Sequence, residues 1–168
     1  SRLLQRNLLR LHTHKTIRIH LATLEEKVLR TEDLDFMREC LQMAMQKGSH
    51  SLAEAALERV NELIDLRAAS EDEDVVQEWP LLEGLCTEPA VVLETMSTFL
   101  SLPPIQFLCL RIMNMLPYAA YGAEQSHCRN IQPHFDVLYL SMLRHIEDAV
   151  LCAETMDCLC HLAGMSEV

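Results

Sequence analysis

The sequence is poor in glycine, in aromatic residues and in long apolar runs. Only 4 of its 168 residues are glycine, which leaves few positions for the tight turns that join β-strands. Aromatic residues make up 5% of the chain, and no stretch approaches the ~18 uninterrupted apolar residues of a membrane-spanning helix. These absences argue against an all-β fold and a membrane span. Hydrophobic residues still make up 49% of the chain, which is enough for a sizeable core. Together, these features favour a helical domain.

Motifs that carry common enzyme chemistry are missing as well. The chain has no glycine-rich phosphate loop, no G-x-S-x-G nucleophile elbow and no H-E-x-x-H zinc motif. The neighbouring acids Glu25 and Glu26 and the acidic run 71–74 have the character of solvated charge rather than of an acid–base pair. We therefore predict a protein that is not an enzyme, with no catalytic residue, no cofactor and no metal.

Cysteine usage indicates a reducing compartment. The seven cysteines are an odd number, and most of them lie in apolar helical patterns, which is typical of reduced thiols packed as small hydrophobic side chains. No signal-peptide pattern opens the chain. We expect an intracellular protein of the cytoplasm or the nucleus, neither secreted nor membrane-spanning. The cysteines are Cys40, Cys86, Cys109, Cys128, Cys152, Cys158 and Cys160.

One group of thiols invites a zinc interpretation. Cys158, Cys160 and His161 lie close in the sequence, with His127 and Cys128 as distant candidates. Structural zinc sites prefer two cysteines spaced C-x(2–4)-C at a turn. A C-x-C pair within a helix points its thiols about 200° apart, so we predict buried packing instead of metal binding.

Charge is unevenly distributed along the chain. The net charge is −11, yet residues 1–20 hold five bases and no acid. The bases are Arg2, Arg6, Arg10, Lys15 and Arg18, interspersed with His12, His14 and His20. One interpretation is a solvated basic helix face, and the alternative is a basic amphipathic arm that contacts nucleic acid or an anionic membrane as an adaptor. The acidic remainder of the chain is unsuited to either ligand.

Apolar residues recur at helical spacing almost throughout. In the basic N-terminal segment, residues 1–30, the spacing predicts helices, with a new one starting at Thr13 or Thr16. The clearest unit is a helical hairpin over 32–67, where Thr31 is the predicted N-cap and Gly48 the left-handed residue that ends its first helix. Ser49 or Ser51 is predicted to cap its second helix.

Two further hairpins are predicted over 88–116 and 133–163, after an acidic loop at 70–74. Prolines and capping residues supply their boundaries. The predicted boundaries are a start at Thr87-Glu88-Pro89, a stop at Pro103-Pro104, an end at Pro117, a linker over 118–130, a start at Pro133 and a last start at Glu147 or Asp148.

A two-helix unit cannot bury its own apolar face, so successive units must stack into a shared core. We therefore predict a single all-α domain over 1–168, built as stacked helical hairpins in a solenoid fragment. A closed multi-helix bundle is the alternative, because the sequence does not determine how hairpins stack.

The ends of the predicted units resemble the last helix of armadillo repeats, which reads small-apolar, Leu, x, Asn, Leu, Ala. The matching segments are Cys158-Leu159-Cys160-His161-Leu162-Ala163, Ile112-Met113-Asn114-Met115-Leu116 and, more loosely, Val60-Asn61-Glu62-Leu63. His161 stands where the family has Asn. The resemblance covers residues 32–168 and implies an armadillo/HEAT-like fold, that is, a fragment of a right-handed solenoid.

In that family the last helix of each unit lines a concave groove, and its Asn binds the main chain of an extended partner. The resemblance thus implies partner-binding roles for Asn61, Asn114 and His161, with Arg111 close to Asn114. An Asn side chain can bridge a peptide group because it both donates and accepts. The implied function is a non-catalytic scaffold for a partner peptide or amphipathic helix. Two alternatives stay open: these residues are polar groups on exposed helix faces, or the domain stacks on further repeats of a longer chain.

Overall fold

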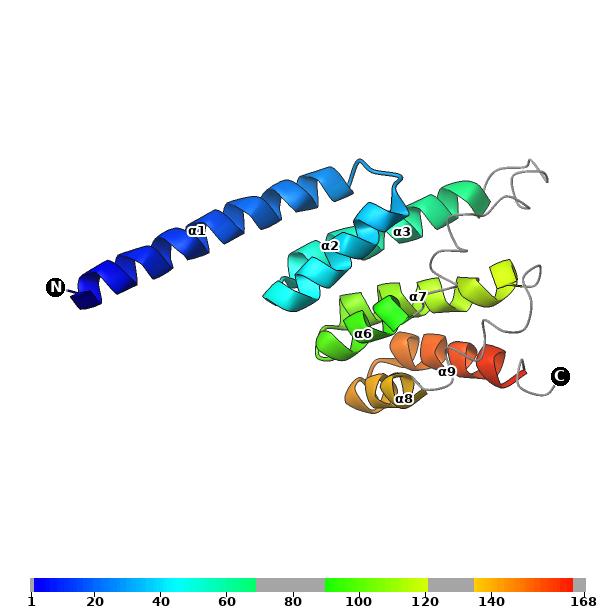
Figure 1. Cartoon of the computed structure of the whole chain (residues 1–168). Helices are drawn as coiled ribbons and strands as arrows, with labels where there is room; N and C mark the ends of the chain where they lie inside the picture. The colour runs from blue at the N-terminus through cyan, green and yellow to red at the C-terminus, as the bar shows by residue number, and fades with distance from the viewer. Residues whose placement is uncertain (1, 69–89, 121–134, 165–168) are drawn as a thin grey trace.

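The protein is all-helical in the part that its computed structural model describes, which comprises residues 2–68, 90–120 and 135–164 and the side chains of 13–66, 91–115 and 135–160. These residues form seven helices and no strand (Figure 1). The helices are α1 (Arg2–Val28), α2 (Leu34–Lys47), α3 (His50–Ala68), α6 (Ala90–Thr98), α7 (Pro103–Ala120), α8 (Phe135–Arg144) and α9 (Ala149–Gly164). The prediction of an all-α fold is confirmed for this part of the chain.

Helix α1 runs without interruption for 27 residues, so the predicted new start at Thr13 or Thr16 is wrong. No proline or glycine occurs within it, and its threonines fit a helix since the Thr23 hydroxyl donates to the carbonyl oxygen of Ile19 at 2.9 Å. The N-terminal part of α1 extends beyond the other helices (Figure 1).

The start of α2 lies later than predicted. Asp33, and not Thr31, is the N-cap, because its carboxylate accepts hydrogen bonds from the backbone N–H groups of Asp35 and Phe36 at 3.0 and 3.2 Å. The Thr31 hydroxyl instead accepts from the Asp33 N–H. A carboxylate at this position also interacts favourably with the helix dipole, which gives Asp33 the advantage over Thr31.

The α2–α3 turn follows the predicted chemistry more closely. Gly48 has φ +64° and ψ +29°, the left-handed conformation, and its N–H donates to α2 carbonyl groups. The Ser49 hydroxyl lies 3.4 Å from the Leu52 nitrogen and accepts at the start of α3. Ser51 does not cap α3; its hydroxyl donates to a Glu25 carboxylate oxygen at 2.6 Å and so ties α3 to α1.

Helices α6 and α7 are joined through a buried amide. The Gln106 side chain is fully buried, and its Nε2 donates to the carbonyl oxygens of Met96 and Phe99 at the end of α6. Pro103 and Pro104 occupy the first turn of α7, where a missing N–H is harmless.

Helix α7 continues past Pro117 to Ala120, so the predicted end at Pro117 is wrong.

In the last hairpin, the second helix begins where the sequence predicts. Asp148 is the residue before α9, and its carboxylate accepts from the Val150 and Leu151 N–H groups at 3.1 Å each. Nε2 of His145, at the α8–α9 turn, hydrogen-bonds the carbonyl oxygen of Leu100 at 2.8 Å. The predicted loop 70–74, the start at Thr87-Glu88-Pro89, linker residues 121–130 and Pro133 lie outside the described residues.

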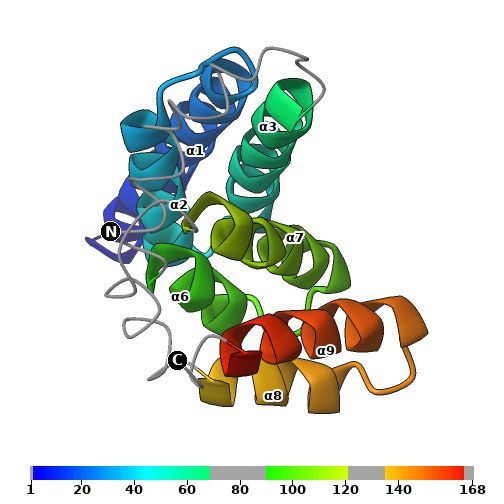
Figure 2. The same ribbon diagram turned by 90° about the vertical axis from the view of Figure 1, so that its right-hand side faces the viewer.

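The helices pack in two rows. Helix α3 packs against α7 and α7 against α9, while α2 packs against α6 and α6 against α8 (Figure 2). Helix α1 packs chiefly against α3. The core lies between the rows and is continuous from Val28 in α1 to Cys158 in α9. None of the helices in the described ranges is long and apolar enough to cross a bilayer.

Gly48→Ala should lower the free energy of unfolding by about 1 kcal/mol, because an L side chain in the left-handed region costs about 1–2 kcal/mol. Nothing lies within 4 Å of an added Cβ, so the loss would come from the backbone alone. Urea unfolding measures the effect. Gly48→Asn is the matched control and should cost less, since Asn tolerates this conformation; equal losses would contradict the backbone explanation.

Candidate functional site

Asn61 joins two hairpins. It lies on α3 with only 5% of its surface exposed. Its Nδ2 donates to the carbonyl oxygen of Leu57 in its own helix at 2.9 Å and to that of Leu108 in α7 at 3.1 Å. Both amide hydrogens are thereby used, and the carbonyl oxygen is the group left for a further partner.

A second contact crosses the same junction. Nη2 of Arg111 on α7 lies 3.0 and 3.2 Å from the two carboxylate oxygens of Asp65 on α3. The side chains are 38% and 58% exposed. An ion pair open to water contributes less than about 1 kcal/mol, so it stabilises the junction less than the buried amide does.

Asn114 repeats the role of Asn61 one hairpin later. Its Nδ2 donates to the Glu154 carbonyl oxygen at 3.2 Å and to the Glu154 carboxylate at 2.8 Å, which joins α7 to α9. Its own Oδ1 is buried and has no hydrogen-bond partner within the described structure. Two asparagines that the armadillo resemblance places in a groove therefore each contact the main chain of the next hairpin.

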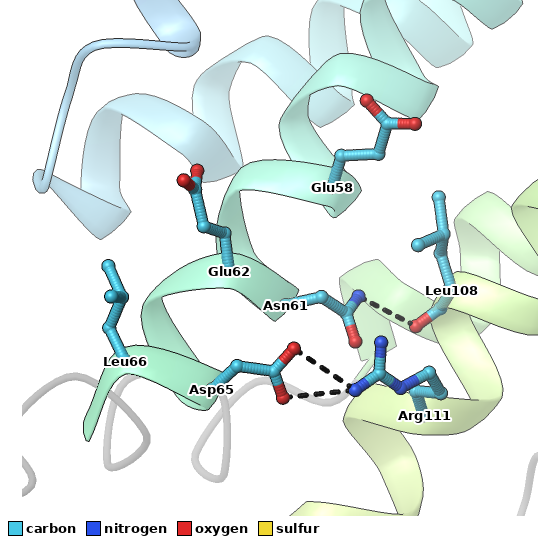
Figure 3. A pocket seen from close by; sticks show the side chains of 7 residues that line it. All are labelled: Glu58, Asn61, Glu62, Asp65, Leu66, Leu108 and Arg111. Carbon is cyan, nitrogen blue, oxygen red and sulfur yellow. Dashed lines mark hydrogen bonds and ion pairs between the residues drawn. The ribbon is translucent and has the colours of Figure 1, made fainter. Parts of the chain in front are cut away.

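Asn61 and Arg111 also line a surface pocket of about 410 Å³ between α3 and α7 (Figure 3). Three carboxylates, one guanidinium, one amide and two leucines surround it. The lining residues are Glu58, Asn61, Glu62, Asp65, Leu66, Leu108 and Arg111. Sequence reasoning missed the acidic members, although Glu58, Glu62 and Asp65 have the spacing of one helix face.

The four implied groove residues are only partly brought together. Asn61 and Arg111 share the pocket, whereas Asn114 lies at the next junction. His161 lies on α9, but its side chain is outside the described residues. Of the basic segment, Lys15 and Arg18 are exposed, and the side chains of Arg2, Arg6 and Arg10 are likewise not described.

The cysteines divide by exposure. Burial raises the pKa of the Cys40 thiol to about 11, with a smaller contribution from Glu39, and that of Cys158 to about 12, with a smaller one from Glu154. Burial also raises the pKa of fully buried Cys109 far above its usual range. Neutral thiols are poor nucleophiles and metal ligands at neutral pH, which disfavours those roles for these three residues.

Of the two cysteines Cys158 and Cys160, which we predicted to be buried, only Cys158 is buried. Cys158 is buried and Cys160 is exposed, so the two thiols lie on different sides of α9 as the helical rotation requires. Across the residues that can be described, no three His, Cys, Asp or Glu side chains gather as a metal site. Cys86, Cys128 and His127 lie outside that part.

No family model, no curated protein and no solved structure matches this chain. The armadillo resemblance therefore stays a prediction that rests on the three quoted segments.

Asn61→Ala should lower the free energy of unfolding by about 1–3 kcal/mol, because it removes a buried donor from two carbonyl groups. Asp65→Ala, at the same junction, should cost less than about 1 kcal/mol since its ion pair is exposed. Chemical unfolding of the two variants gives the comparison. A neutral Asn61→Ala would show that the amide does not hold the junction.

Proposed function

We propose that this protein is a non-catalytic scaffold that binds a basic peptide segment of a partner protein along the row of α3, α7 and α9. The observation that carries the proposal is the pocket between α3 and α7, which combines unpaired acidic charge, apolar walls and the two central residues implied by the armadillo resemblance. An acidic pocket with leucines at its wall suits a long basic side chain, because the carboxylates attract its charge and the leucines contact its aliphatic stem.

The packing pattern supports an open stack of hairpins for the scaffold, and the armadillo/HEAT resemblance implies that the stack is right-handed. The substantial contacts join neighbouring hairpins, and none of them joins α2 or α3 to α8 or α9. A closed bundle would bring the first and last hairpins together. An open stack keeps one row of helices available to a ligand along its whole length.

The pocket charge favours a cationic side chain in the partner. Asp65 is paired with Arg111, and Glu62 with Arg59 at 2.6 Å, whereas no ion pair involving Glu58 occurs in the described structure. Leu66 is 60% exposed at the rim. A lysine or arginine could lay its aliphatic stem on the leucines and place its charge near Glu58.

Main-chain binding would differ from the armadillo pattern. Because the Asn61 amide hydrogens are used inside the protein, Asn61 could only accept a hydrogen bond from a partner N–H. The partner's carbonyl groups would need another donor, and Arg111 is the one in the pocket. Recognition by this geometry would depend on the partner's side-chain charge more than on a ladder of asparagine contacts.

Selection of a random peptide library on the whole chain should enrich peptides with a lysine or arginine, and Glu58→Lys should weaken their binding about tenfold, equal to about 1.4 kcal/mol. Fluorescence anisotropy of a selected peptide measures the change. Glu94→Lys makes the same charge reversal on exposed α6 and is the matched control. Selected peptides without a basic residue, or equal effects of the two variants, would reject the pocket as the binding site.

The second candidate function uses α1. Because α1 is one helix that extends beyond the hairpins, the five basic residues of its first 20 positions lie along one continuous arm (Figure 1). Lys15 and Arg18 are exposed on this arm. Such an arm suits contact with the phosphates of nucleic acid or of an anionic membrane.

If the arm binds duplex DNA, affinity should fall steeply with salt, and Lys15→Glu/Arg18→Glu should reduce the slope of log K against log[salt] by about 2. Titrations at two salt concentrations measure the slope, with vesicles containing anionic lipid as a parallel arm. Arg30→Glu/Lys47→Glu changes the charge equally at two exposed residues beyond the end of α1 and should leave the slope nearly unchanged. Absence of binding to DNA, RNA and vesicles at low salt rejects this function.

A further inference from the structure

Helix α8 presents an apolar face away from the core. Leu138 and Ser141 are buried against the rest of the protein, whereas Tyr139, Leu140 and Leu143 are 54%, 50% and 45% exposed. The exposed three have the spacing of one helix face. Large apolar side chains gathered in this way mark interaction surfaces, unlike single exposed leucines.

The other helices of the same row do not share this property. Helices α2 and α6 face solvent with polar side chains, among them Gln42, Gln46, Glu94, Ser97 and Thr98 around a second pocket. Helices of this row that face water thus carry polar side chains there, so the exposed leucines of α8 need an explanation that applies to the last hairpin alone.

Apolar side chains are also exposed on the turn after α8 and on α9. Ile146, Val150 and Met156 are 67%, 60% and 49% exposed. The hairpin that ends the described stack thus carries apolar residues on both of its helices where no described helix covers them.

The junctions already present indicate what such a surface does. The carbonyl oxygen of Leu108 in α7 accepts from an asparagine of α3, and that of Glu154 in α9 accepts from an asparagine of α7. Helices α7 and α9 can therefore be aligned on Leu108 and Glu154. In this alignment Met156 corresponds to Leu110 and Cys160 to Asn114. Leu110 is fully buried and Asn114 holds the next hairpin, whereas Met156 and Cys160 are exposed. The last hairpin therefore has the residue pattern of a junction whose other half is not among the described helices.

We propose that a second copy of this chain covers this surface, so that two molecules join end to end through α8 about a two-fold axis. A two-fold axis brings the same surface of each molecule together, and an apolar surface can be complementary to itself. The copy supplies a helical hairpin of matching character, which is the kind of element that covers every other junction in the stack.

Charge at the ends of α8 supports this occupant. Asp136 is in the first turn and Arg144 in the last, both are exposed, and neither forms an ion pair with any described residue. If the two α8 helices run antiparallel, Asp136 lies beside Arg144 of the partner subunit, and the reverse pair forms symmetrically. This register places Leu140 at the axis, between the two ion pairs, and it aligns the helix dipoles favourably.

Sedimentation equilibrium of the whole chain should show a monomer–dimer equilibrium, and Leu140→Glu should raise the dissociation constant at least about tenfold, because it brings two carboxylates together at the axis. Leu29→Glu introduces the same charge at a leucine that is also 50% exposed, just after α1, and should leave the equilibrium unchanged. Circular dichroism checks that both variants stay folded, which their exposure favours.

Charge exchange tests the register. Asp136→Arg and Arg144→Asp should each weaken the dimer, because each places like charges together, and the double variant should restore it. A wild-type chain that is monomeric at every concentration overturns the proposal and leaves a different protein or a further repeat as the occupant. A dimer that survives Leu140→Glu overturns the surface, and a double variant that stays monomeric overturns the antiparallel register.

Discussion

Each junction between successive hairpins depends on an asparagine amide that donates to the main chain of the next hairpin. Asn61 donates to Leu108, and Asn114 donates to Glu154. Leaving a buried donor such as that of Asn61 unpaired costs about 1–3 kcal/mol, and acceptors on a helix occur only at fixed positions. The Asn114 amide is only partly buried, so its loss should cost less. Apolar packing is not directional and tolerates some sliding, so the amide bonds are what select one register for each pair of hairpins.

Local chemistry explains which parts of the fold were predictable from the sequence. Gly48 and Asp148 were recognisable because a left-handed residue or a capping carboxylate acts within four residues of its own position. The wrong predictions concern competition between local signals. Thr31 and Asp33 could both cap α2, and the break expected near Thr13 rested on threonines that a helix accommodates once hydrophobic spacing continues on both sides.

The site was predictable only in part, because it depends on how α3 is rotated and where α7 approaches it. Sequence alone marked Asn61 and Arg111, but it could not show that the Asn61 amide is directed into the junction instead of the groove. That orientation follows from tertiary packing around Leu108, far away in the sequence. The acidic side of α3 was visible as a spacing of Glu58, Glu62 and Asp65, yet a solvated face has the same spacing.

Asn61, Leu108, Asp65 and Arg111 join two hairpins and also line the pocket between them. If the pocket binds a cationic ligand as proposed, binding and the rigidity of this junction would be linked. A cation bound between Glu58 and Asp65 would compete with Arg111 for the Asp65 carboxylate, which is exposed and weakly held. The Asn61 amide would keep the hairpins in register while that exchange occurs, since its part-buried bond to Leu108 involves neither Asp65 nor Arg111. By linkage, whatever free energy the ion pair contributes to the junction is subtracted from the affinity of a ligand that displaces it. Under the proposed function, a weak, exposed ion pair at this position would be an advantage, because a stronger bond there would stiffen the junction but close the pocket to a cationic partner.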